Sequence, residues 1–173
     1  LLGSHDTERI KTMLAGAPAA LQLAYLLLFG LPGAPAIYYG DEIGLEGGKD
    51  PACRRAFPWD ETKWDMALRD WIKTLIRVRL GHTALRKGSL EFVYTPVSDP
   101  LLAFIRRHDR ESLFIAVNGS NTMRSLTIQI KDSNLPAEAE INDLLGQPIT
   151  VRVSDASISI NLPAYTGAYF KLG

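Results

Sequence analysis

A chain of 173 residues is long enough for one ordinary domain, or for part of a domain and a second small one. A complete eight-stranded α/β barrel is excluded, because it needs about 250 residues. The apolar fraction of 46% predicts a buried core, and the zero formal net charge argues against binding to nucleic acid or to an anionic membrane. The single cysteine, Cys53, excludes an internal disulfide bond but leaves the cellular compartment open.

The first part of the chain predicts two helices, separated by a short strand and a long loop. Pro18 suits the first turn of a helix, which the apolar residues 19–29 continue until Gly30. Glycine and proline interrupt the apolar run that follows, which argues against a membrane span and favours a short buried parallel strand at residues 34–39. Residues 40–64 form a long polar loop, and residues 64–80 show the spacing of an amphipathic helix.

Beyond Gly88 the pattern changes to the two-residue alternation of β-strands. Alternating runs lie at residues 90–94, 113–117, 126–130, 149–153, 158–162 and 168–172. Turn residues separate them at 109–110, 118–119, 132–134, 146–148 and 154–155. Short strands at this spacing predict an antiparallel β-sandwich over residues 87–173, as a second domain after residues 1–86.

Two loops of the first domain gather charged residues directly after short apolar runs. The first holds His5 and Asp6, and the second begins at Gly40 and carries Asp50 and Arg54. A parallel α/β barrel presents its chemistry in this way, because its buried strands end in loops that carry the reactive groups. These two loops are therefore the candidate site.

Three motifs in order resemble the α-amylase family of glycoside hydrolases: SHD at residues 4–6, GAPAIYYGDEIG at 33–44 and GGKDPACRRAFPWD at 47–60. The third most resembles the neopullulanase, cyclomaltodextrinase and maltogenic amylase branch. The resemblance covers the whole chain. It implies that residues 1–86 are the last β/α units of a (β/α)8 TIM-type barrel, from the end of strand seven to helix eight. Residues 87–173 then form the antiparallel β-sandwich domain that follows this barrel.

The resemblance also implies a role for each candidate site residue. Asp6 resembles the family's carboxylate that stabilises the oxocarbenium-like transition state without being the nucleophile, and His5 resembles a histidine that hydrogen-bonds sugar hydroxyls. Asp50 and Arg54 resemble a pair that holds glucose units on the non-reducing side of the scissile bond. The residue types suit this chemistry, because a developing positive charge is stabilised by a fixed carboxylate. Arginine donors and aspartate acceptors match vicinal hydroxyls.

No motif here resembles the nucleophile and the general acid, which a retaining glycosidase needs about 5 Å apart. In this family they lie upstream of the segment that the resemblance covers. We therefore expect the C-terminal part of an α-1,4-glucan hydrolase acting on maltooligosaccharides, cyclodextrins or pullulan, inactive by itself. A transglycosylase of the same family, a non-catalytic glucan-binding or interaction fragment, and one half of an associating barrel are the alternatives.

The expected partners are an α-glucan oligosaccharide and the rest of the catalytic barrel, with a homo-oligomer left open. We expect no cofactor; some family members hold calcium, but no ligands for it are identifiable in this sequence, so no metal site is predicted. Asp41 and Glu42 are neighbours that point to opposite faces of a strand, which favours structural hydrogen bonding. Cys53 is expected to be a packed thiol. The β-domain shows no aromatic pair suited to a sugar, which favours a covering role over starch binding.

Overall fold

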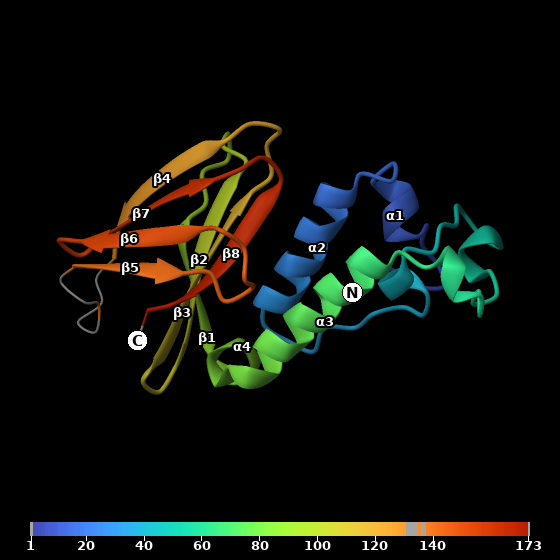
Figure 1. The fold of residues 1–173 in the computed structure, drawn as a ribbon, viewed down its shortest axis with the longest axis horizontal. Helices are drawn as coiled ribbons and strands as arrows, with labels where there is room; N and C mark the ends of the chain where they lie inside the picture. The colour runs from blue at the N-terminus through green and yellow to red at the C-terminus, as the bar shows by residue number, and fades with distance from the viewer. Residues whose placement is uncertain (1, 131–134, 136–137, 173) are drawn as a thin grey trace.

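The computed structural model describes residues 2–130, 135 and 138–172 (Figure 1). Its first half is helical, with two long helices that pack against each other. The elements are α1 (Ile10–Met13), α2 (Pro18–Gly30), η1 (Asp41–Ile43), η2 (Ala52–Arg54), η3 (Glu61–Lys63), α3 (Met66–Gly81) and α4 (Thr83–Lys87). The helix predicted from Pro18 to Gly30 is confirmed. Helix α3 begins two residues later than predicted, because the Asp65 side chain accepts a hydrogen bond from the Leu68 N–H (3.0 Å) and caps the helix there.

The strand predicted at residues 34–39 is wrong for this structure. These residues form no strand in the described part of the chain, and their side chains are exposed or half-buried rather than buried. A parallel strand exists only beside another strand that shares its hydrogen bonds. Both described sheets are made by residues beyond Gly88, so this segment has no such neighbour.

The second half is a sandwich of two antiparallel sheets, as predicted (Figure 1). One sheet has the strand order β1-β2-β3-β8 and the other β4-β7-β6-β5. The described strands are β1 (Ser89–Tyr94), β2 (Leu101–His108), β3 (Glu111–Asn118), β4 (Arg124–Gln129), β5 (Glu138–Asn142), β6 (Thr150–Ser154), β7 (Ser157–Leu162) and β8 (Thr166–Lys171). The turn predicted at residues 132–134 lies outside the described residues.

The sheet β1-β2-β3-β8 lies between the other sheet and the helices, so its central strands are buried on both faces. Phe104 of β2 packs in a core with α2 and α3, whereas its neighbour Ile105 packs in the core between the two sheets. Strand β2 therefore has no polar face and no alternating pattern, which is why the sequence did not predict it. Strand β5 was also missed; it is an edge strand in which Ala139 and Ile141 alternate with exposed glutamates.

Side chains also join the helices to this sheet by hydrogen bonds. The Tyr169 hydroxyl donates to the Leu26 carbonyl, and Arg106 Nη1 donates to the Gly30 carbonyl (2.7 Å). Both acceptors lie in the C-terminal part of α2, and Gly30 is its last residue, where a carbonyl group has no partner within the helix. Among the described residues, no helix is both long enough and apolar enough to cross a membrane.

Candidate functional site

The structure brings the four candidate residues, His5, Asp6, Asp50 and Arg54, into one cluster. Arg54 lies at its centre: its Nε is 2.9 Å from Asp50 Oδ1 and donates to the His5 carbonyl (3.0 Å), and its Nη2 is 3.6 Å from Asp6 Oδ1. His5 Nε2 is in turn 3.1 Å from Asp6 Oδ2. Two loops more than forty residues apart in the sequence therefore meet at one arginine.

These side chains are open to solvent. Asp6 is 68% exposed and Arg54 49% exposed. Ion pairs of this kind contribute little to stability, because water screens them and ordering the side chains costs entropy. The cluster nevertheless presents guanidinium donors next to carboxylate acceptors, which can exchange their partners for the hydroxyl groups of a ligand. Its chemistry suits a neutral, hydroxyl-rich ligand.

Beneath the cluster lies a buried ion pair, Arg9–Asp41, which the sequence did not identify as part of the site. Arg9 is fully buried, and its Nη1 is 2.9 Å from Asp41 Oδ1. The same nitrogen donates to the Tyr39 carbonyl, and Nε donates to the Cys53 carbonyl (2.8 Å). The guanidinium carbon also lies 4.2 Å from the centre of the Tyr38 ring. The structural role expected for Asp41 is confirmed, but Asp41 and Glu42 lie in the short helix η1 and not on a strand as predicted.

The surroundings of this pair are polar and buried. Burial raises the pKa of Asp41, and the hydrogen bond from Arg9 opposes the rise. Burial, with the nearby Asp41 and Glu42 carboxylates, likewise raises the pKa of Tyr25 well above its ordinary value. Arg9 Nη2, the Tyr25 hydroxyl and Glu42 Oε2 are buried and have no hydrogen-bond partner among the described residues. No local sequence pattern could have revealed this buried group around Arg9 and Asp41, because its members come from four separate segments.

Cys53 is fully buried and its thiol donates to the His5 carbonyl (3.2 Å), so the prediction of a packed thiol is confirmed. Trp64 Nε1 donates to the Pro58 carbonyl (2.7 Å), which fixes this ring against the loop. Trp59 is 84% exposed and contacts Phe57. Among the described residues, no group of three or more His, Cys, Asp or Glu side chains is placed to hold a metal ion.

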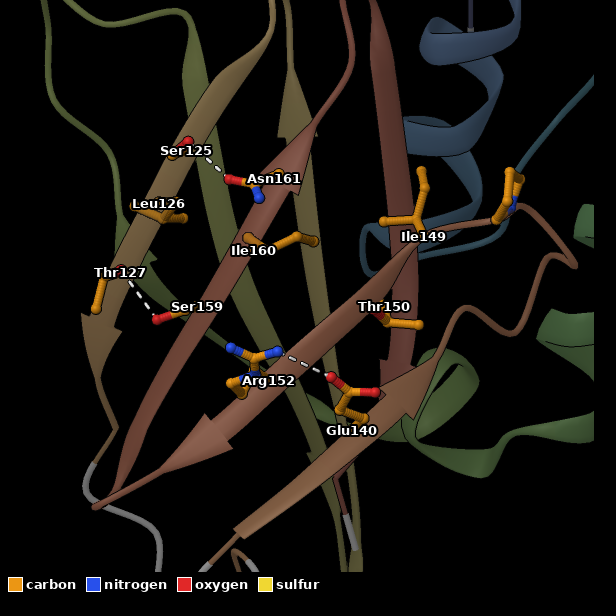
Figure 2. Close-up of a pocket in the computed structure, with 11 residues that line it drawn as sticks. Ser125, Leu126, Thr127, Glu140, Ile149, Thr150, Arg152, Ser159, Ile160 and Asn161 are labelled. Atoms are coloured by element: carbon orange, nitrogen blue, oxygen red, sulfur yellow. Dashed lines mark hydrogen bonds and ion pairs between the residues drawn. The ribbon is translucent and has the colours of Figure 1, made fainter.

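The outer face of the sheet β4-β7-β6-β5 carries a hollow lined by polar side chains (Figure 2). Ser125 donates to Asn161 (2.7 Å), and Arg152 Nη2 is 3.1 Å from Glu140 Oε1. These groups are paired with one another, and no aromatic ring lines the hollow.

Comparisons with known proteins agree with the motifs. Residues 1–79 match the family model described as alpha amylase, catalytic domain. A cyclomaltodextrinase from a Bacillus species is 41% identical over 130 residues, covering 73% of this chain and 23% of that protein. Neopullulanase 2 from Thermoactinomyces vulgaris is 35% identical over 133 residues, covering 77% and 23%.

The whole fold is also found in solved structures. The debranching enzyme of Nostoc punctiforme superposes with a TM-score of 0.83 at 33% identity, over 98% of this chain and 34% of that one. The chain spans about a quarter of the length of the curated relatives named above. Sequence and structure together show that the chain belongs to the α-amylase family of glycoside hydrolases, and its relatives include cyclomaltodextrinases, a neopullulanase and a maltogenic α-amylase.

Proposed function

We propose that this chain is the C-terminal part of a retaining α-1,4-glucan hydrolase that acts on maltooligosaccharides, cyclodextrins or pullulan. The observation that carries the proposal is the meeting of His5, Asp6 and Asp50 around Arg54. The chain covers about a quarter of two relatives, a cyclomaltodextrinase and a neopullulanase, whose names refer to cyclomaltodextrins and pullulan. The substrate class is taken from those names and from the donor and acceptor groups of the cluster.

In this proposal each residue of the cluster has one task. Asp6 places its carboxylate near the anomeric carbon, where positive charge develops in the transition state. His5 and Arg54 donate hydrogen bonds to sugar hydroxyls, and Asp50 accepts them. Asp41, the buried carboxylate next to the cluster, is engaged by Arg9, and no motif of this sequence resembles the family's nucleophile or general acid. The nucleophile and the general acid are therefore assigned to another part of a longer protein.

The flank of α3 supports the presence of further barrel units in that longer protein. An apolar hollow there is lined by Phe29, Ile37, Ile76 and Leu80, and Leu80 is 64% exposed. Soluble proteins seldom leave such apolar patches uncovered. We place the remaining β/α units of the barrel against this flank, next to residues 34–39, which would then gain the strand neighbour that they lack here.

Transglycosylation by the same site remains the alternative reaction, since it differs only in whether water or a sugar hydroxyl accepts the glycosyl group. A non-catalytic glucan-binding fragment is the second alternative. The open cluster around Arg54 favours this one for the isolated chain, because its side chains are accessible as they stand.

The test measures binding and turnover separately on the 173-residue chain. We expect calorimetry to detect β-cyclodextrin binding, lost in Arg54→Ala and kept in the control Arg152→Ala, whose exposed arginine pairs with Glu140 in the sandwich. We expect no release of reducing sugar from β-cyclodextrin or maltotriose. No binding by the wild-type chain would overturn the role of the cluster. Sugar release that vanishes in His5→Ala/Asp6→Ala would show instead that the chain holds its own catalytic carboxylates.

A further inference from the structure

The Arg9 side chain joins the three segments on which the site is built. It directly precedes α1, four residues after His5, and its guanidinium reaches Asp41 and the carbonyls of Tyr39 and Cys53. Its own backbone N–H donates to the Gly47 carbonyl (2.8 Å). A fully buried guanidinium with these fixed partners cannot move without breaking several charge-assisted hydrogen bonds at once.

The contacts beneath the cluster are therefore stronger than those within it. The Arg54–Asp6 pair is exposed and 3.6 Å long, so it cannot by itself hold two loops together. Arg9, in contrast, fixes the backbone of Cys53, whose thiol and whose neighbour Arg54 both donate to the His5 carbonyl. The position of His5 relative to Arg54 thus depends on Arg9.

The close approach of Gly3 to Asp41 fixes the same loop from its other end. A Cβ atom at Gly3 would overlap the Asp41 carboxylate, so the chain before His5 is packed directly against the partner of Arg9. The loop that carries His5 and Asp6 is consequently held at both ends by the one buried pair.

We propose that Arg9 is the positioning residue of this site, which holds His5 and Asp6 against Arg54 through the Cys53 backbone. That Arg9 holds the loops in place is inferred from the contacts alone. That this affects sugar binding rests on the function proposed above, so the experiment measures the loop position and the sugar affinity separately.

The first readout is the reactivity of Cys53, the single cysteine of the chain, toward a thiol reagent such as 5,5′-dithiobis(2-nitrobenzoic acid). The variant Arg9→Met/Asp41→Asn removes the bridge without leaving an unpaired buried charge. We expect Cys53 of this variant to react at least about tenfold faster than Cys53 of the wild type. The rate should not change at low urea concentrations, because a local opening exposes little new surface. Arg9→Lys keeps a positive charge near Asp41 but lacks the guanidinium group that also reaches the Cys53 carbonyl. We therefore expect Cys53 of Arg9→Lys to react as fast as Cys53 of Arg9→Met/Asp41→Asn.

The control is Arg106→Met, which removes another fully buried arginine that donates to backbone carbonyls, in the sandwich. Its Cys53 should react only through unfolding of the helical part, at a rate that rises with urea. Slow labelling in Arg9→Met/Asp41→Asn, or labelling that rises with urea in step with global unfolding, would overturn the positioning role.

The second readout is β-cyclodextrin affinity, which we expect to be at least about tenfold weaker in Arg9→Met/Asp41→Asn, since a displacement of about 1 Å in a site is costly. If the wild-type chain binds no glucan, the proposed function fails, while the labelling still decides the role of Arg9. If the variant labels fast yet binds as tightly as wild type, Arg9 does not position the binding groups.

Discussion

Glu111 shows how one residue can link the helical part to the sheet through its charge. It begins β3, and its carboxylate accepts a hydrogen bond from the Ala84 N–H in the first turn of α4 (2.7 Å) and lies 2.6 Å from His82 Nδ1. Burial acts to raise the pKa of Glu111, but the bond from Ala84 and the contact with His82 outweigh it, so the pKa is lowered. The ionised form is thus the one that the folded state prefers.

The sign of the pH dependence follows from this lowered pKa. The stabilisation by Glu111 is fully present above its unfolded pKa of about 4.3 and is lost as the pH falls through the lower folded value. We expect Glu111→Gln to lower the free energy of unfolding by about 1 kcal/mol at neutral pH and by less in acid. Urea unfolding of both proteins at several pH values measures this; a constant difference across the acid range would contradict it.

Among the elements, α3 best shows which features of a helix are local. Its apolar stripe was predicted from spacing, and Leu68, Ile72 and Leu75 are indeed buried. Its first residue depends on Asp65, whose carboxylate satisfies an N–H group that has no partner within the helix. The segment 34–39 shows the opposite case, because a strand is defined by a neighbour and not by its own composition.

Removal of the α3 cap should weaken this helix measurably. We expect Asp65→Ala to lower the free energy of unfolding by about 1 kcal/mol, because the Leu68 N–H loses its acceptor. Asp70→Ala is the matched control, since Asp70 is an exposed residue of the same helix whose carboxylate forms an exposed ion pair with Lys73. Equal stability of the two variants in urea unfolding would show that the cap contributes nothing.

In the molecule as a whole, the helices pack against the sheet β1-β2-β3-β8 in one core, and Arg106 is a fully buried polar link between the two parts. It is fully buried, and it donates to the carbonyls of Gly30, Gly88 and Ser89 at 2.7, 2.8 and 3.0 Å. Burial and the nearby Arg79 lower the pKa of Arg106. No carboxylate of the described residues pairs with it, so its charge is stabilised by backbone dipoles.

This link makes a prediction about cooperativity. All three tryptophans, Trp59, Trp64 and Trp71, lie in the helical part, whereas circular dichroism also reports on the strands. We expect both signals of the wild type to change at the same urea concentration. Arg106→Met leaves buried carbonyls unpaired, which should cost about 3 kcal/mol and let the tryptophan signal change first. The exposed control Arg152→Met should keep the wild-type urea midpoint of both signals. The same unchanged midpoints in Arg106→Met would contradict the link.

The sequence by itself determined the elements whose patterns are local: the helix from Pro18, the helix predicted over residues 64–80, the alternating strands, and the motifs that indicate the family. It also named His5, Asp6, Asp50 and Arg54, because these residues lie in short motifs. Only the tertiary structure decided that β2 is a strand, since burial on both faces removes the alternation that would reveal it. The structure alone also identified Arg9 and Asp41 as the support of the site. Their contacts join segments 30 to 44 residues apart, and no local pattern records such a distance.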